Sequence, residues 1–152
     1  MSRTTTTTGA ARAVARLAKQ VEVALTPLDL SLPQYRVLAL LADGSSASSV
    51  LARKLAVSPP SVTAVVDGLV ARGLVERRDD PEDRRRLTLL LTRDGKRLLA
   101  AADIAGEARL DEIAASFEEA GLVDPPDALA AGLDGWNRAL DRNREAHVRR
   151  DS

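Results

Sequence analysis

The chain is 152 residues long, 45% hydrophobic and only 2% aromatic, and it balances 22 basic residues against 22 acidic residues, with no cysteine. This length suits one domain with its own core, and a core built mostly of Leu, Val and Ala favours helices. The lack of cysteine excludes disulfides, thiolate zinc sites and thiol redox sensors. No apolar stretch is long enough for a bilayer span or a signal peptide. We therefore expect a cytoplasmic protein that does not bind membranes.

The neutral total charge conceals an uneven distribution. Residues 44–97 contain 11 basic and 7 acidic residues, a net charge of +4, whereas residues 98–145 contain 4 basic and 11 acidic residues, a net charge of −7. A basic middle beside an acidic C-terminal part directs one part of the chain towards polyanions and keeps the other away from them. Nucleic acid is therefore a candidate partner of the middle segment.

The N-terminal segment is predicted to be a short tail followed by a helix. Residues 1–9 include a run of five threonines, Thr4 to Thr8, and lack hydrophobic periodicity, so we expect a disordered tail. From Ala10 onward, apolar residues recur at three- and four-residue steps, which indicates one face of a helix. We assign residues 10–30 to this N-terminal helical segment, and Pro27 should end its helix.

Capping signals define the next two helices. Ser31 is suited to cap a helix whose first turn tolerates Pro33, and Asp43-Gly44 should close that helix. After a serine-rich linker, the segment Val50 to Ala56 predicts a short helix, and Val57-Ser58 predicts a tight turn. A third helix should begin directly after this turn.

The third helix starts at Ser58-Pro59, a cap followed by proline at the first helical position. Its apolar residues recur with helical spacing and should be buried: Val62, Val65, Val66, Leu69 and Val70. The positions left facing outward are mostly small or polar: Pro60, Ser61, Thr63, Ala64 and Asp67. Two helices joined by a short turn, the second with a small polar outer face, form a helix-turn-helix whose second helix suits the major groove of DNA.

A short hairpin is predicted after this helix. Gly73 should stop the helix, and the segments Leu74–Arg78 and Arg86–Thr92 have extended character, the second with Leu87, Leu89 and Leu91 on one face. The acidic, proline-containing run between them is typical of a turn and leads into arginines. A hairpin with an arginine tip predicts the wing of a winged helix, placed in the minor groove.

The C-terminal part is predicted to contain two more helices. Thr92 can cap a long helix from Arg93, with an inner face that includes Leu98, Leu99, Ala102, Ala105 or Gly106, Leu110, Ile113 and Phe117. Gly121 to Pro126 should interrupt it, and a last helix carries Leu129, Leu133, Trp136 and Leu140. One small domain cannot bury all these apolar faces, so we expect the helices of residues 98–148 to pack on a second subunit, followed by a tail over residues 149–152.

With these motifs in order, the chain resembles the MarR family of transcriptional regulators from about Ala10 to Val148. The resemblance is carried by Leu32-Pro33-Gln34-Tyr35-Arg36-Val37-Leu38, Leu51-Ala52, Ser61-Val62-Thr63, Gly73-Leu74-Val75, and Asp83-Arg84-Arg85 through Leu91-Thr92 to Gly95. It implies a mainly α fold with a small β-hairpin wing, in which residues 31–97 form the winged helix-turn-helix. It also implies a homodimer built from the N-terminal helix (10–30) and the C-terminal helices (98–148).

The resemblance implies contacts with double-stranded DNA. It makes Arg85 the wing-tip arginine of the minor groove and Asp83 the residue that braces it. The residues expected to contact DNA are Pro60, Ser61, Thr63, Ala64, Arg53, Lys54, Arg72, Arg77, Asp83, Arg84, Arg85 and Arg86. Many relatives carry a longer polar residue at Ala64 and a base at Gly68, so affinity should depend more on the wing and on phosphate contacts. For Arg53, Lys54 and Arg72, an ordinary solvated surface base is an equal alternative.

The resemblance also implies a small amphipathic or aromatic effector. The matching positions are Arg16, Lys19, Tyr35 and Trp136. The alternative is that both aromatic residues belong to a core, and Trp136 to a dimer contact. The function predicted is sequence-specific regulation of transcription, most often repression, on a pseudo-palindromic operator. The competing hypothesis is a winged-helix protein-interaction module that binds no DNA. No catalytic residues, metal site or cofactor are predicted, because the sequence shows no nucleophile and base pair, metal cluster or phosphate-binding glycine loop.

Overall fold

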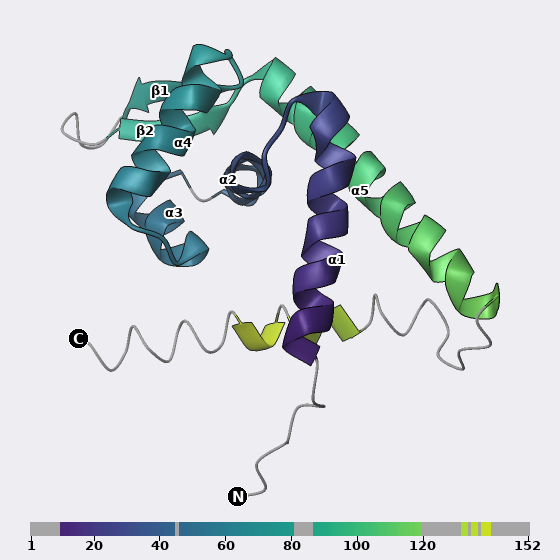
Figure 1. Cartoon of the computed structure of the whole chain (residues 1–152). Helices are drawn as coiled ribbons and strands as arrows, with labels where there is room; N and C mark the ends of the chain where they lie inside the picture. The colour runs from purple at the N-terminus through teal and green to yellow at the C-terminus, as the bar shows by residue number, and fades with distance from the viewer. Residues whose placement is uncertain are drawn as a thin grey trace, which may run out of the picture. The chain divides into compact units, whose positions relative to one another are not determined.

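The computed structural model describes residues 10–44, 46–80 and 87–119, together with 132–133, 135–136 and 138–140. The elements, in chain order, are α1 (Ala10–Leu25), the 3-10 helix η1 (Thr26–Leu28), α2 (Leu32–Ala42), α3 (Ser48–Leu55), α4 (Pro59–Ala71), β1 (Val75–Asp79), β2 (Leu87–Leu91) and α5 (Arg93–Glu119) (Figure 1). The predicted mainly α fold with one β-hairpin is confirmed. The chain divides after Arg109 into two compact units, and the core and the hairpin lie in the first.

One hydrophobic core holds the elements of the first unit together. Each of α1, α2, α3, α4 and β2 contributes a leucine that is fully buried: Leu25, Leu38, Leu51, Leu69 and Leu89. Burial of such a side chain contributes roughly 1.5–3 kcal/mol relative to exposure. Since these leucines belong to one cluster, the helix-turn-helix and the hairpin are positioned by the same core.

Side-chain caps start α2 and α4 where the sequence predicts them. Ser31 Oγ accepts from the Gln34 amide at 3.3 Å, and Gln34 Oε1 accepts from the Ser31 amide at 3.0 Å, which makes a complete capping box. Ser58 Oγ accepts from the Ser61 amide at 3.4 Å at the start of α4. Between α3 and α4 the chain turns at Ala56, which has a φ of 55°. The left-handed residue of this turn thus comes just before the predicted Val57-Ser58.

The buried face of α4 agrees with its periodicity. Val62, Val66 and Leu69 are buried, and Val65 and Val70 pack against the same cluster while partly exposed. The outward-facing residues of the helix do not belong to this core cluster. Its predicted amphipathic pattern is confirmed.

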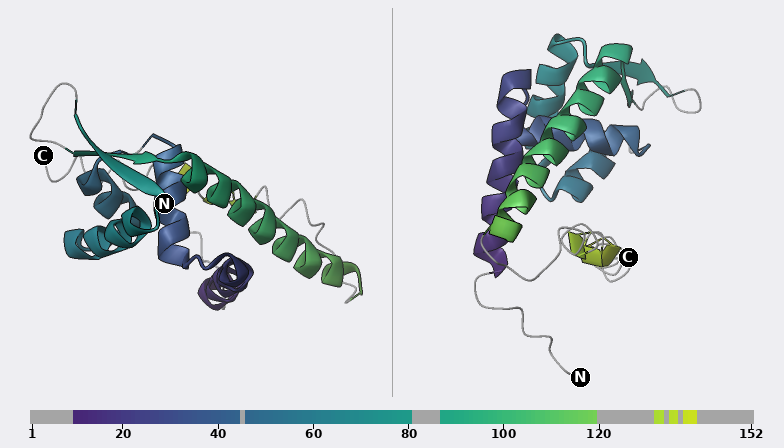
Figure 2. Two further views of the ribbon diagram at one scale, coloured as in Figure 1. Left: turned by 90° about the horizontal axis from the view of Figure 1, so that it is seen from above. Right: turned by 90° about the vertical axis from the view of Figure 1, so that its right-hand side faces the viewer.

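The hairpin is antiparallel, with Val75 opposite Leu91 and Asp79 opposite Leu87. Figure 2 shows the two strands beside α4, and β1 contacts that helix. Leu89 is buried and its amide donates to the Ser46 carbonyl at 2.8 Å, which connects β2 to the segment before α3. The prediction that Leu87 shares a half-buried face with Leu89 is wrong for burial, because Leu87 lies at the outer end of the strand and is 54% exposed.

A junction of hydrogen bonds joins the end of α4, the hairpin and α5. Thr92 Oγ1 donates to the Gly73 carbonyl at 2.7 Å and accepts from the Gly95 amide at 3.0 Å, so Thr92 caps α5 as predicted. The Thr92 amide donates to the Leu74 carbonyl at 3.1 Å. A Cβ added to Gly95 would lie 2.0 Å from that carbonyl oxygen, so the close approach requires glycine.

The long helix α5 buries the predicted positions Leu99, Ala102 and Gly106 in the first unit. The side chains of its last three residues, which include Phe117, lie outside the described residues, as do the predicted interruption at 121–126 and Leu129. In the second unit, Leu133, Trp136 and Leu140 are exposed. Among the helices that the structure describes, none has the length and apolar character needed to cross a membrane.

Candidate DNA-binding surface

The outer face of α4 presents small side chains. Pro60, Ser61, Thr63 and Ala64 are all exposed in the first two turns of the helix. Their hydroxyls are engaged locally, since Thr63 Oγ1 donates to the Pro59 carbonyl at 3.1 Å and Ser61 Oγ lies 2.8 Å from Ser58 Oγ. The predicted base-reading residues therefore do lie on one exposed surface. That surface allows close approach of the helix to a partner rather than long-range contacts by extended side chains.

Gly68 lies on the side of α4 that faces α2. Its backbone is half-buried, and a Cβ added there would be 3.7 Å from Gln34 Nε2. A side chain at this position would therefore begin in ordinary van der Waals contact with Gln34, a residue of the α2 capping box.

The basic residues at the end of α3 lie at the helix terminus where cations are favoured. Arg53 and Lys54 occupy its last turn, where the carbonyl ends of the helix carry partial negative charge. The Arg53 side chain is exposed and Lys54 is half-buried. Arg53 is therefore a cation available to a phosphate.

Arg77, on β1, forms an ion pair with Asp67, an outward residue of α4. The neighbouring Arg78 forms an ion pair with Glu76 of its own strand at 2.6 Å. Opposite charges on α4 and β1 are thus brought together across the Gly73 turn. This contact was not predicted, and Arg77 was expected to contact phosphate.

Arg72 lies at the opposite end of α4 from the predicted base-reading residues. It follows Ala71, and the 12 residue-to-residue steps from Pro60 to Arg72 correspond to roughly 18 Å of helix. Its Nη1 donates to the Asp29 carbonyl at 2.6 Å and its Nη2 lies 3.8 Å from Asp29 Oδ2. Arg72 therefore connects the end of α4 to the segment between α1 and α2.

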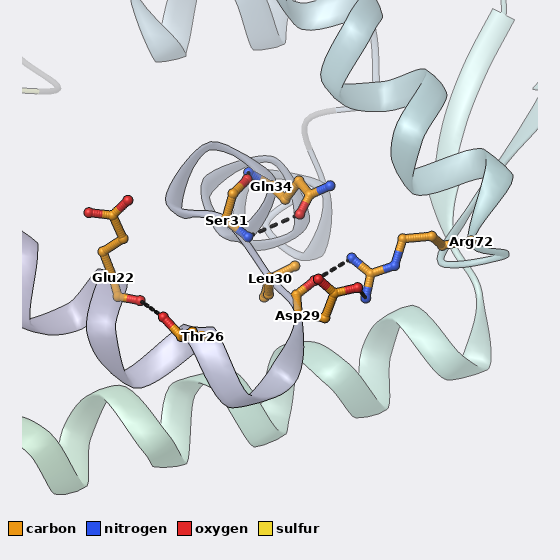
Figure 3. Close-up of a pocket in the computed structure, with 7 residues that line it drawn as sticks. All are labelled: Glu22, Thr26, Asp29, Leu30, Ser31, Gln34 and Arg72. Carbon is orange, nitrogen blue, oxygen red and sulfur yellow. Dashed lines mark hydrogen bonds and ion pairs between the residues drawn. The ribbon is translucent and has the colours of Figure 1, made fainter.

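This contact borders a pocket of about 380 Å³. Figure 3 shows Arg72 extending from the end of α4 towards Asp29, which has a left-handed backbone with a φ of 50° and accepts the guanidinium hydrogen bond with its carbonyl. The lining residues are mainly polar: Glu22, Thr26, Asp29, Leu30, Ser31, Gln34 and Arg72. None of the residues predicted for an effector lines this pocket.

The predicted effector residues of the first unit have other partners. Tyr35 Oη donates to Asp103 Oδ1 at 2.7 Å, which joins α2 to α5. Burial, this hydrogen bond and the charges of Asp103 and Glu107 raise the pKa of Tyr35 well above its usual range. Lys19 forms an ion pair with Glu22 at 2.8 Å, and Arg16 is exposed.

Trp136, the fourth predicted effector residue, belongs to the second compact unit and is 63% exposed.

A further polar contact in the first unit was not predicted from the sequence. Gln20 Oε1 accepts from Arg109 Nε at 3.1 Å and Nη2 at 2.7 Å, which joins α1 to α5. No spacing rule points to a pair of residues so far apart in the chain.

The predicted wing-tip residues Asp83, Arg84, Arg85 and Arg86 lie outside the described residues. The strands that flank them are paired as far as Asp79 and Leu87. A helix-turn-helix followed by such an antiparallel hairpin and a capped helix defines the winged helix-turn-helix class.

Comparison with known proteins places the chain within this class. The MarR family model matches residues 28–86. The uncharacterized HTH-type transcriptional regulator YhbI of Bacillus subtilis (strain 168) is 36% identical over 95 residues, which cover 61% of this chain and 62% of YhbI. YfiV, also an uncharacterized HTH-type transcriptional regulator of that strain, is 33% identical over 117 residues, 75% of this chain and 69% of YfiV. The chain belongs to the MarR family.

A solved relative adds structural similarity. The transcriptional repressor CouR bound to a 23-mer DNA duplex has 30% identity and a TM-score of 0.64, over 83% of this chain and 87% of that chain. CouR from Rhodococcus jostii RHA1 has also been solved bound to p-coumaroyl-CoA, with 25% identity, a TM-score of 0.66, and coverage of 86% and 87%. The alignment to YhbI spans less than two thirds of that relative's length.

Proposed function

We propose that this protein is a homodimeric, sequence-specific DNA-binding regulator of transcription that acts in the cytoplasm as a repressor. The observation that carries this proposal is the exposed, small-residue face of α4 beside the paired hairpin, in a chain of the MarR family. The solved complex of CouR with DNA supports it, because CouR shares this fold. The relatives are named as transcriptional regulators and not as enzymes.

In the proposed complex, α4 enters the major groove and the hairpin tip reaches the adjacent minor groove. Two copies related by a two-fold axis would bind half-sites about one helical turn apart, roughly 34 Å. The exposed apolar side chains Val14 and Val23 of α1 and Ile104 of α5 support a second subunit as their cover.

We further propose that a small amphipathic or aromatic effector releases the protein from DNA. CouR, with its bound p-coumaroyl-CoA, is the relative that supports this step. An effector acts only if it binds the DNA-free arrangement more tightly than the DNA-bound one. Arg16, Lys19, Tyr35 and Trp136 remain the proposed contacts, and displacement of the Tyr35–Asp103 bond would link effector binding to α2 and α5.

The proposal is tested by selecting fragments from a genomic DNA pool and measuring their affinity by fluorescence anisotropy at several salt concentrations. We expect a pseudo-palindromic operator and an affinity that falls steeply with salt, because each phosphate contact releases counterions. Arg85→Ala should weaken operator binding by at least about tenfold while leaving helix content and dimer mass unchanged. Binding that ignores both salt and sequence would support a protein-interaction module instead.

A further inference from the structure

The ion pair between Asp67 and Arg77 joins the predicted base-reading helix to the wing. Arg77 Nη2 donates to Asp67 Oδ1, and the side chains are 35% and 57% exposed, respectively. Asp67 comes three residues after Ala64 and four after Thr63, so it belongs to the same outer face of α4. A carboxylate on this face would repel DNA phosphates unless a cation compensates it.

Arg77 lies on the part of β1 that the core does not hold. Along the strand, Val75 is buried, Glu76 is half-buried, and Arg77 to Asp79 are exposed. Arg77 is paired with Leu89, the buried residue at the centre of β2. The Arg77–Asp67 contact thus attaches β1 to α4 at the point where burial of the strand ends.

These observations decide between two roles for Arg77. As a phosphate contact, Arg77 would leave Asp67 and expose an uncompensated carboxylate on the DNA-facing side of α4. As a positioning residue, it would keep Asp67 neutralised and fix the hairpin relative to the helix. Only the second role gives a function to both Asp67 and Arg77.

We propose that Arg77 is a positioning residue that, through Asp67, fixes the wing at a set distance from α4, so that major-groove and minor-groove contacts are made together. The DNA part of this inference rests on the proposed function. It corrects the expectation that Arg77 contacts phosphate, and it makes Asp67 a residue that supports operator binding despite its negative charge.

The Asp67→Ala variant tests the proposal, because the two roles of Arg77 predict changes of opposite sign in operator affinity. Removal of an acid from the DNA-facing helix should strengthen binding on electrostatic grounds alone. The positioning role predicts the opposite: a loss of operator affinity of about fivefold for Asp67→Ala and for Arg77→Ala, with no further loss in the double variant, because the two residues act as one unit. Stronger binding by Asp67→Ala would overturn the proposal.

Salt dependence separates the two roles of Arg77. Loss of a phosphate contact lowers the slope of log affinity against log salt by about one, as we expect for Arg53→Ala. Arg77→Ala should leave the slope at the wild-type value, and a decrease of about one would overturn the proposal. Arg77→Lys keeps the charge but loses the planar guanidinium, so it should weaken operator binding as Arg77→Ala does.

A measurement without DNA keeps this inference distinct from the proposed function. Asp67→Ala, Asp67→Asn and Arg77→Ala should each accelerate amide hydrogen exchange in the β1–β2 strand pair, with helix content unchanged. Arg78→Ala is the matched control, because its ion pair stays within β1, and its exchange should equal that of the wild type. Unchanged exchange in the Asp67 and Arg77 variants would overturn the positioning role. Failure of the wild type to bind any DNA would refute the proposed function and leave the exchange result to decide this one.

Discussion

The helix-turn-helix and the outer half of the hairpin are held in place by different kinds of contact. Each helix from α2 to α4 contributes a fully buried leucine to the core, whereas the outer half of β1 is exposed. The base of the hairpin shares the core through Val75 and Leu89 and is also held by the hydrogen bonds of Thr92. Beyond Val75, β1 contacts α4 through the Arg77–Asp67 ion pair. The positions of α4 and of the hairpin base therefore follow from burial, whereas the outer half of β1 makes a polar contact with α4. Four substitutions can break or sharpen this difference.

The largest effect is expected from the core. Leu69→Ala removes a fully buried side chain from α4 and should lower the free energy of unfolding by about 2–5 kcal/mol, since a cavity remains. Urea denaturation followed by circular dichroism measures the change. The control is Leu87→Ala, at an exposed position of the hairpin, which we expect within about 0.5 kcal/mol of the wild type. Equal losses in the two variants would contradict the assignment of the core.

Gly95→Ala disturbs the hydrogen-bonded junction of α4, the hairpin and α5 and leaves the core side chains in place. The new Cβ would overlap the Leu74 carbonyl oxygen, so the variant should lose about 1–3 kcal/mol. Gly106→Ala is a matched control in the same helix, because its Cβ would lie at an ordinary 3.9 Å from Val21. Alanine favours helix by up to about 1 kcal/mol over glycine, so the control should be neutral or more stable. The same denaturation experiment shows whether the two changes have opposite signs.

Tyr35→Phe tests a polar contact that joins α2 to α5 and does not involve the hairpin. The loss of the hydrogen bond from α2 to Asp103 of α5 should cost about 1 kcal/mol at neutral pH. Because the folded state raises the pKa of Tyr35, mainly through burial, it favours the protonated phenol. This contribution is complete below the ordinary pKa of 10.0 and is lost as pH rises towards the folded-state value. Unfolding measured across alkaline pH should therefore show the wild-type advantage shrinking above about pH 10. A difference that does not change with pH would argue against the raised pKa.

Ser58→Ala removes the side-chain cap of α4 and should be the mildest change, about 1 kcal/mol or less at this solvent-exposed site. Hydrogen exchange should show faster opening of the first turn of α4, with the hairpin amides unchanged. Ser61→Ala keeps the cap and serves as the control. If the two variants behave alike, the Ser58 cap contributes nothing beyond its contact with the Ser61 hydroxyl.

The elements could be predicted from the sequence because their signals are local. Ser31, Ser58 and Thr92 cap their helices through residues within a few positions, and α4 shows its buried face by spacing alone. The outward residues Pro60, Ser61, Thr63 and Ala64 follow from the same spacing. Burial of Leu87 was predicted wrongly because alternation identifies a face of a strand but not where the core beneath it ends.

Polar partners could not be predicted, because they depend on how the elements pack. Arg72 meets Asp29, 43 positions away, and Tyr35 meets Asp103, 68 positions away. In the sequence, a basic residue that pairs with an acid and one that is available to phosphate look the same. A phosphate contact was therefore predicted for both Arg53 and Arg72. In the structure Arg53 is exposed, whereas Arg72 is paired with Asp29.

The close packing of Gly68 against Gln34 has a consequence for sequence variation. Gln34 completes the cap of α2 through Oε1, and its Nε2 would lie 3.7 Å from a Cβ at position 68, an ordinary van der Waals distance. A methyl group therefore fits at position 68, and a longer side chain there would start beside the amide of the capping residue. The residue types at positions 34 and 68 should consequently influence each other in relatives of this chain.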